Sequence, residues 1–374
     1  MSWRILCVAG ARPNFMKIAP LLRAFRRDAR FDARLVHTGQ HYDDKLSKVF
    51  FDELAIPRPD IELEVGSGSH AQQTAEIMKR FEPVVEKEQP HGVLVVGDVN
   101  STIGCAIVAA KMFRKDEFSY RGSPRKRPVI IHVEAGLRSN DWDMPEEINR
   151  LLTDSISDLL FVSEPSGMTN LTREGVGPER AIMVGNVMID TLLAARERAM
   201  QSTVLSTLNL GERGYGLVTL HRPSNVDDTQ MLRHLVGVLD SLGVPLVFPV
   251  HPRTRKRIAD AGIQLDPARW QLIEPLGYLD FLRLQSSARV VLTDSGGVQE
   301  ETTVLGVPCI TLRENTERPV TCDQGTNQLV GTSRDAIVAA YGKIDQVRAA
   351  ARVPDQWDGK SADRIVAEIA KTLG

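Results

Sequence analysis

The sequence predicts an α/β protein made of two Rossmann-like, doubly wound domains. The chain has 374 residues, more than one hydrophobic core usually serves, so we expect two domains of roughly 150–200 residues each. Apolar, strand-like segments alternate with amphipathic segments almost throughout, which indicates parallel sheets flanked by helices. Several apolar segments end directly in acidic, histidine or glycine residues, the usual position of a ligand site in open α/β sheets.

The first half contains five predicted strands with helices among them. The strands are expected at 4–9, 34–38, 93–97, 129–133 and 159–162. The helices are expected at 14–27, 43–54, 71–88, 101–113 and 146–155. Ser69 precedes the third helix as a candidate N-cap. Residues 115–127 carry five basic residues, a glycine and a proline, so we expect a solvated surface loop there.

The second half repeats this architecture. Its strands are expected at 182–184, 216–220, 245–250, 271–274, 289–293 and 307–312. Its helices are expected at 187–200, 228–242, 253–261, 278–286, 297–305, 325–330, 334–341 and 361–373. The fifth strand of the first half ends in Glu164-Pro165-Ser166-Gly167. These turn-forming residues predict a boundary between a domain of residues 1–167 and one that begins at residue 168.

The composition argues against several classes of protein. Hydrophobic residues make up 42% of the chain and charged residues 25%, which is ordinary for a soluble globular protein. The net charge of −2 argues against a nucleic-acid-binding protein. No apolar run approaches the roughly 18–20 residues that span a membrane. The four cysteines are widely spaced, and Cys7 and Cys309 fall in apolar runs, so we expect reduced thiols in a cytoplasmic protein.

Acidic residues lie at and after the end of the fourth predicted strand. Residues 129–133 are a run of mainly β-branched residues, and Glu134 follows at once. Pro145 then opens a helix whose first turn contains Glu146 and Glu147. We interpret Glu134 and Glu146 as site residues, because acids at strand ends often line ligand crevices. We interpret Glu147 as a capping or loop acid.

Two other strand ends of the first half carry charged side chains. The first strand leads into Gly10-Ala11-Arg12-Pro13 and then Lys17, so that Arg12 and Lys17 place two cations around a helix start. They suit a phosphate, or are ordinary surface charge. The turn has neither the nicotinamide-binding glycine pattern nor that of a Walker loop. After the third strand, Asp98 is either the N-cap of the next helix or a base beside a cleft.

Histidines end two strands of the second half. His221 and His251 each follow an apolar strand, a position that suits phosphate binding but also an ordinary hydrogen-bonded histidine. The chain has no His-Glu-x-x-His motif and no Cys/His cluster, so we expect no metal site.

The sharpest signal is the turn Ser295-Gly296-Gly297 between a buried strand and a helix. Glycines let backbone N–H groups approach an anion, and the helix N-terminus favours negative charge. Glu301 lies about one helical turn further along and can accept hydrogen bonds from two sugar hydroxyls. Arg318 supplies a loop cation near the same edge of the sheet.

In chain order, these segments resemble the non-hydrolysing UDP-N-acetylglucosamine 2-epimerases. The resemblance is carried by Gly10–Pro13, Gly97-Asp98, His132–Arg138, Pro145–Arg150, His221–Pro223, Asp294–Glu301 and Thr316–Pro319. It implies a glycosyltransferase-B fold with an interdomain active-site cleft. The last helix then crosses back, giving domains of residues 1–167 plus 355–374 and of residues 168–354. It also implies a UDP-sugar substrate, a homodimer, and no cofactor.

The resemblance also implies a reaction. UDP-GlcNAc and UDP-ManNAc interconvert when UDP leaves with loss of the C2 proton and adds back with C2 inverted. Proton transfer at the two faces of C2 needs at least two groups, for which Asp98, Glu134 and Glu146 are the candidates. The charge of the departing UDP would be met by Arg12, Lys17, His221, Arg318 and the amides of Ser295, Gly296 and Gly297. The resemblance places Glu301 at the ribose and Phe281 near the uracil.

A second site and three other functions stay open. Many bacterial members of that family bind an activating UDP-GlcNAc at positions that correspond to Gln40, Arg222 and His251. Here Gln40-His41-Tyr42-Asp43 departs from their Gln-His-Arg pattern. The same residues fit in part an epimerase of a modified sugar, such as a UDP-diacetamido-glucuronic acid. They also fit in part a glycosyltransferase of this fold, or a nucleotide-sugar-binding regulator without turnover.

Overall fold

The computed structural model describes residues 2–39 and 52–374 of the chain. The chain divides into two compact units: unit 1 comprises Met1–Thr191 and Asp355–Gly374, and unit 2 comprises Leu192–Pro354. It passes from one unit to the other within helix α7 (Val187–Met200). Most of the predicted helix 43–54 lies outside the described residues.

Unit 1 is built on a seven-stranded sheet in the order β3-β2-β1-β4-β7-β8-β9. All of its strand pairs are parallel. The strands are β1 (Trp3–Ala9), β2 (Phe31–His37), β3 (Ile61–Glu62), β4 (Gly92–Val96), β7 (Val129–Ala135), β8 (Leu159–Val162) and β9 (Ala181–Met183). The strand order reverses between β1 and β4, so the loops that follow these two strands diverge and leave room for a ligand.

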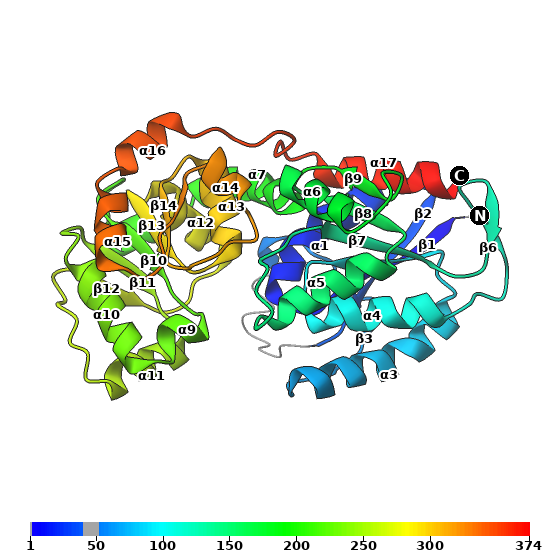
Figure 1. The fold of residues 1–374 in the computed structure, drawn as a ribbon, viewed down its shortest axis with the longest axis horizontal. Helices are drawn as coiled ribbons and strands as arrows, with labels where there is room; N and C mark the ends of the chain where they lie inside the picture. The colour runs from blue at the N-terminus through cyan, green and yellow to red at the C-terminus, as the bar shows by residue number, and fades with distance from the viewer. Residues whose placement is uncertain (1, 40–51) are drawn as a thin grey trace. The chain divides into compact units, whose positions relative to one another are not determined.

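Helices cover the sheet of unit 1 in two groups, which Figure 1 shows. They are α1 (Arg12–Arg26), α3 (His70–Glu88), α4 (Asn100–Lys111), α5 (Pro145–Ile156), α6 (Pro165–Arg173) and α17 (Ser361–Leu373). α4 packs between α3 and α5, and α17 packs against α1. The predicted cap of α3 is confirmed, because the Ser69 hydroxyl accepts a hydrogen bond from the Gln72 N–H at 3.3 Å.

The chain stays in unit 1 beyond residue 167, where the sequence analysis placed the domain boundary. Pro165 begins α6 instead of ending a domain. β9 then pairs with β8 in the first sheet, with Leu160 opposite Ala181. The C-terminal helix returns to unit 1, where the backbone N–H groups at its start donate to the buried Asp190.

Residues 115–127 lie at the surface, as predicted, but they have regular secondary structure. They contain an antiparallel hairpin of β5 (Phe118–Tyr120) and β6 (Ser123–Arg125). The Arg121 N–H donates to the Thr372 carbonyl at 2.7 Å. The guanidinium of Arg125 pairs with Asp158 at 2.6 Å. These long-range contacts order the segment, and no local pattern in the sequence reports them.

Unit 2 is built on a six-stranded parallel sheet in the order β12-β11-β10-β13-β14-β15. Its strands are β10 (Gly216–Thr219), β11 (Leu246–Pro249), β12 (Trp270–Ile273), β13 (Val290–Thr293), β14 (Cys309–Thr311) and β15 (Asn327–Leu329). Its helices are α8 (Val204–Thr207), α9 (Pro223–Val226), α10 (Thr229–Asp240), α11 (Pro252–Asp260), α12 (Tyr278–Ser287), α13 (Gly296–Leu305), α14 (Val320–Asp323), α15 (Arg334–Tyr341) and α16 (Ile344–Ala350). Here the strand order reverses between β10 and β13.

The helix predicted at 325–330 is wrong, because β15 occupies this segment. Asn327–Leu329 pairs in parallel with Cys309–Thr311 at the edge of the sheet. The Asn327 side chain is buried, and Thr311 donates a hydrogen bond to it at 2.5 Å. A strand of three residues is too short for its hydrophobic period to distinguish it from a helix.

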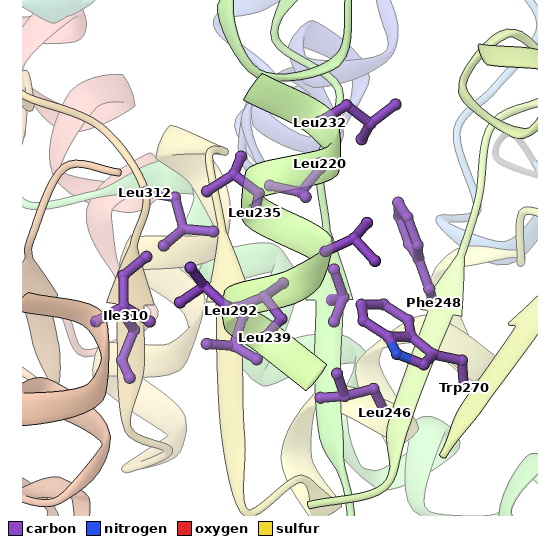
Figure 2. Close-up of a cluster of buried hydrophobic side chains, with 14 of the residues drawn as sticks. Leu220, Leu232, Leu235, Leu239, Leu246, Phe248, Trp270, Leu292, Ile310 and Leu312 are labelled. Carbon is purple, nitrogen blue, oxygen red and sulfur yellow. The ribbon is translucent and has the colours of Figure 1, made fainter. Parts of the chain in front are cut away.

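The core of unit 2 lies between α10 and the sheet (Figure 2). Leu232, Leu235 and Leu239 recur at helical spacing on α10 and are fully buried. They pack with side chains of the neighbouring strands, among them Leu246, Phe248, Trp270, Leu292, Ile310 and Leu312. This packing fixes the strands whose carboxyl ends carry the polar residues described below.

All four cysteines are free thiols, and Cys7, Cys105 and Cys309 are buried. Burial raises the pKa of these three thiols, so they stay protonated at neutral pH. Across residues 2–39 and 52–374, no helix has the length and apolar character needed to cross a membrane.

Candidate functional site

In unit 1, Glu134 and Lys17 form a buried ion pair at the carboxyl edge of the sheet. The Lys17 Nζ lies 2.6 Å from the Glu134 carboxylate, and neither side chain is more than 5% exposed. Lys17 comes from α1 and Glu134 from β7. Between them lies Gly97, just after β4: a Cβ there would lie 3.3 Å from the Lys17 Nζ and 3.8 Å from the Glu134 Oε1. Helix α1 and the ends of the neighbouring strands β4 and β7 thus meet at one point.

The backbone of Glu134 is itself unusual. Its φ of +72° lies in the left-handed region, and the β7–β8 register shifts between Val133 and Ala135. A non-glycine residue in this conformation costs on the order of 1–3 kcal/mol and persists only where its surroundings fix it. Such bulges and outliers often lie at functional sites, because they re-aim a side chain out of the strand alternation.

Asp98 is held by Arg150 and is not the N-cap of α4. That helix begins at Asn100 with Val99 in the N-cap position. The Asp98 carboxylate accepts hydrogen bonds from the Arg150 Nε at 3.0 Å and Nη2 at 2.7 Å, and its side chain is 24% exposed. The sequence analysis did not single out Arg150. The available signal was its position four residues after Glu146, on the same face of α5.

Glu146 and Glu147, both in the first turn of α5, have different surroundings. Glu147 is buried and accepts hydrogen bonds from the Ser139 and Asn140 N–H groups at 2.9–3.1 Å, so it is the loop acid that was predicted. Glu146 faces a cavity of about 250 Å³. The other residues that line it are Ser67, Gly68, His70, Gln73, Val99, Asn100 and Asn149. The cavity is smaller than the roughly 300–1,000 Å³ of sites for drug-sized ligands, so it suits only part of a nucleotide sugar.

Two predicted site residues have no described side chain. α1 begins at Arg12, two residues before its predicted start, but the side chain of Arg12 is not described. Gln40 lies outside the described residues altogether. Their predicted roles stay predictions.

In unit 2, Asp294 organises the loop that carries His221. Asp294 is fully buried and accepts hydrogen bonds from the backbone N–H groups of His221 and Arg222 at 3.0–3.2 Å. The His221 Nδ1 lies 2.8 Å from the Asp294 carboxylate, whereas the His221 side chain is 60% exposed. Burial alone would raise the pKa of Asp294, but these hydrogen bonds outweigh it and hold the pKa below its usual value. Asp294 therefore orients an exposed imidazole.

The Ser295-Gly296-Gly297 turn lies beside Arg318, which comes from the loop before α14. Ser295 is the N-cap of α13, and a Cβ at Gly296 would lie only 2.7 Å from the Arg318 Nη1. The glycine is therefore needed for this close approach. Arg318 is itself fixed by two buried carboxylates, those of Glu300 at 2.8 Å and Glu317 at 3.2 Å. A helix N-terminus and a fixed guanidinium thus meet at one point.

Glu301 is buried with Tyr278 as its partner, which the sequence analysis did not identify. The Tyr278 hydroxyl donates to the Glu301 Oε1 at 3.0 Å. Burial raises the pKa of Glu301 to about 7, against the opposing effect of the hydrogen bonds from Tyr278 and Gln285. α12 carries Tyr278 and also the partly buried Phe281. The sequence offered one indication of Tyr278: it lies three residues before Phe281, and therefore on the same face of α12.

Arg222 and His251 have local partners within unit 2. The Arg222 Nε donates to the Asp294 carbonyl at 3.2 Å. His251 is the N-cap of α11, where its Nδ1 accepts a hydrogen bond from the Arg253 N–H at 3.2 Å. Two of the three residues predicted for a second site therefore have structural contacts, and the site itself stays a prediction.

Comparison with known proteins identifies the family. The family model for UDP-N-acetylglucosamine 2-epimerase matches residues 23–370. A UDP-N-acetylglucosamine 2-epimerase homolog of Methanococcus maripaludis is 42% identical over 349 residues, which are 91% of this chain and 92% of the relative. The UDP-2,3-diacetamido-2,3-dideoxy-D-glucuronate 2-epimerase of Pseudomonas aeruginosa is 41% identical over 342 residues, 90% of each chain.

Solved structures confirm the predicted fold. The UDP-GlcNAc 2-epimerase of Methanocaldococcus jannaschii, solved with UDP-GlcNAc and UDP, matches with a TM-score of 0.87 at 38% identity, covering 98% of this chain and 99% of that one. A UDP-glucosyltransferase of Polygonum tinctorium, 14% identical, matches with a TM-score of 0.61 over 100% of this chain and 99% of that one, and shows the fold alone. The two Rossmann-like domains are thus of the glycosyltransferase-B type, and the chain belongs to the UDP-N-acetylglucosamine 2-epimerase family.

Proposed function

We propose that the protein interconverts UDP-GlcNAc and UDP-ManNAc by eliminating UDP and adding it back. One observation carries this proposal: each unit by itself presents groups that suit one part of this reaction. Unit 2 presents a helix N-terminus and the guanidinium of Arg318, which suit a pyrophosphate. Unit 1 presents carboxylates at the ends of adjacent strands, which suit proton transfer at a sugar carbon.

Unit 2 binds UDP and stabilises it as a leaving group. The N–H groups at the start of α13, together with Arg318 and His221, meet the negative charge that grows on the pyrophosphate. Glu301 accepts hydrogen bonds from the ribose hydroxyls, and Phe281 lies near the uracil, as the family resemblance implies. Because Gly296 leaves Arg318 so close to the helix N-terminus, the two act on the same phosphate oxygens.

The reaction takes place in two steps. A carboxylate removes the C2 proton, the electrons of the C–H bond form a C1–C2 double bond, and the C1–O bond breaks so that UDP leaves with the bonding pair. In the second step a UDP oxygen adds to C1 and a proton returns to C2 from the opposite face. Asp98, Glu134 and Glu146 supply the acid and base of these transfers. Lys17 neutralises Glu134, its observed partner.

The proposal is tested by proton NMR of UDP-GlcNAc incubated with the protein in deuterated buffer. Elimination exposes C2 to solvent, so deuterium should enter C2 of both epimers. Epimerised product that retains protium at C2 would contradict the elimination path. An unchanged UDP-GlcNAc spectrum would contradict the epimerase activity itself.

A modified UDP-sugar is the second candidate substrate, because a relative with 41% identity acts as a UDP-2,3-diacetamido-2,3-dideoxy-D-glucuronate 2-epimerase. A glucuronate carries a carboxylate at C6, which would need a cation. The described lining of the cavity beside Glu146 contains neither lysine nor arginine, and Glu146 itself is acidic. We therefore expect a higher kcat/KM for UDP-GlcNAc when both sugars are assayed side by side. The reverse preference would assign the protein to the modified sugar.

A further inference from the structure

His132 is a fully buried histidine at the centre of unit 1, and both of its ring nitrogens face acceptors. The Nε2 lies 2.8 Å from the Gly97 carbonyl oxygen. The Nδ1 lies 2.6 Å from the Asp154 Oδ1. A carbonyl oxygen has no proton to give, so the Nε2 must be the donor in the first contact.

The second contact also requires a donor on His132. The other oxygen of Asp154 accepts a hydrogen bond from the Gly136 N–H at 3.0 Å and lies 2.7 Å from the Arg138 guanidinium. These contacts favour the carboxylate form of Asp154. With a carboxylate on one side and a carbonyl on the other, the imidazole needs a proton on each nitrogen.

The pair connects the three elements that carry the proposed acids. Gly97 directly follows β4 and precedes Asp98. Gly136 follows the bulge at which Glu134 adopts its left-handed φ. Asp154 lies on α5, the helix whose first turn carries Glu146. One imidazolium and one carboxylate therefore hold two strand ends and a helix in a single arrangement.

We propose that His132 is a permanent imidazolium which, with Asp154, acts as a positioning residue for the acids that transfer the C2 proton. This inference rests on the proposed function. A buried ion pair seldom contributes more stability than well-packed apolar residues of the same volume. It does fix geometry, since each hydrogen bond specifies a direction. A shift of about 1 Å at a reacting group can cost roughly 100-fold in rate.

The charge state is tested in the wild-type protein by NMR of ¹⁵N-labelled histidine rings. The eight histidines are followed between pH 6 and 9. We expect one ring with protons on both nitrogens throughout this range, protected from exchange with solvent. If every ring shows an unprotonated nitrogen at pH 9, the inference is wrong.

The positioning role is tested with Asp154→Asn and a matched control, Asp158→Asn. Asp158 also accepts a backbone N–H from β7, that of Ile130 at 2.9 Å, and also pairs with arginine side chains, but at the opposite end of the strand. We expect both variants to melt at lower temperature than wild type. Only Asp154→Asn should lower kcat, by roughly 100-fold, with UDP affinity kept within about twofold in calorimetry.

Two outcomes would overturn the positioning role. One is a normal kcat in Asp154→Asn, and the other is an equal loss of kcat in Asp158→Asn. Wild-type turnover is measured in the same assay, so failure of the proposed epimerisation appears in the wild type. Failure of this inference appears instead in the variants and in the ring protons. If Asp154→Asn does not fold, the ring protonation of the wild type still decides the inference.

Discussion

In both units the polar residues lie at the carboxyl ends of parallel strands, but their carboxylates have different partners. In unit 1 the acids are matched with cations: Glu134 with Lys17, and Asp98 with Arg150. In unit 2 the buried Glu301 is matched with a neutral hydroxyl, that of Tyr278, and its pKa rises to about 7. The comparison separates carboxylates that are paired with cations from a buried carboxyl group that is paired with a hydroxyl.

The glycines at the two switch points both leave room for charged side chains. In unit 1, Lys17 and Glu134 lie close to Gly97. In unit 2, the Arg318 guanidinium lies close to Gly296, at the start of α13. In the proposed function, unit 1 supplies the carboxylates that transfer protons and unit 2 supplies the groups that bind UDP. Substitutions of the acids in unit 1 should therefore lower kcat alone, whereas substitutions in unit 2 should also weaken UDP binding.

The largest expected effect is the loss of an acid in unit 1. Asp98→Asn, Glu134→Gln and Glu146→Gln keep size and hydrogen bonding but remove the base, so kcat should fall by roughly 10²–10⁴-fold. UDP affinity should hold or rise, because each change removes a negative charge. Initial rates and calorimetric UDP titration on the same proteins measure the two quantities, and Asp158→Asn, at the opposite end of the sheet, serves as the control. A variant with near-normal turnover would return its residue to a structural role.

The next largest effect should be the loss of Arg318, which tests the binding half. Arg318→Ala removes a charge-assisted hydrogen bond worth about 1.5–3 kcal/mol, so UDP affinity should fall roughly 10- to 150-fold. Its kcat should fall as well, because the lost charge also faces the departing pyrophosphate. The matched control is Arg313→Ala, which removes the other guanidinium paired with Glu317, at 2.7 Å. Equal losses of affinity in both variants would show that Arg318 acts through the network and not on UDP.

The sequence was sufficient for the alternation of strands and helices and for the strand ends that carry polar residues. The turn Ser295-Gly296-Gly297 was found because glycines before a helix have a specific physical use. Partners were harder to predict, because a contact such as that of His132 with Asp154 joins residues 22 positions apart on different elements. Asp98 was left undecided between cap and base; the structure excludes the cap, because Val99 is the N-cap of α4, and the role as a base stays a proposal.

The misplaced elements have a related cause. The three-residue strand β15 has no period that a sequence pattern can reveal. The hairpin in 115–127 is ordered by contacts such as that of Arg125 with Asp158, far along the chain. The boundary at residue 167 relied on turn-forming residues, but Pro165 is equally common at the first position of a helix.

The raised pKa of Glu301 predicts that UDP binding depends on pH near neutrality. Its folded-state pKa is about 7, so its ionised fraction, and with it the affinity for ribose hydroxyls, should fall about tenfold from pH 8 to pH 6. The pH dependence of the free energy of unfolding has the opposite sign to that of UDP affinity. The folded protein holds this proton and the unfolded chain releases it near pH 4.5, so the contribution of Glu301 to stability falls as pH rises from about 4.5 to 7.

Glu301→Gln is the matched variant for this prediction. It cannot titrate, so the difference between its UDP affinity and that of the wild type should grow from pH 6 to pH 8. Calorimetric titrations and thermal melts at pH 6, 7 and 8 measure both effects. A constant difference across this range would contradict a titrating Glu301.

The smallest expected effect concerns His251, which the family resemblance places in a second UDP-GlcNAc site. In the structure its ring caps α11, so His251→Ala should cost about 0.5–1 kcal/mol and lower Tm by only a few degrees. Asp228→Ala is the control, because Asp228 caps α10 of the same unit at 2.7 Å and has no predicted ligand. If His251 is only a cap, the two variants should show the same dependence of rate on UDP-GlcNAc concentration. A change in the shape of that curve in His251→Ala alone would instead assign His251 to a second binding site, because loss of a helix cap in unit 2 has no means of producing it.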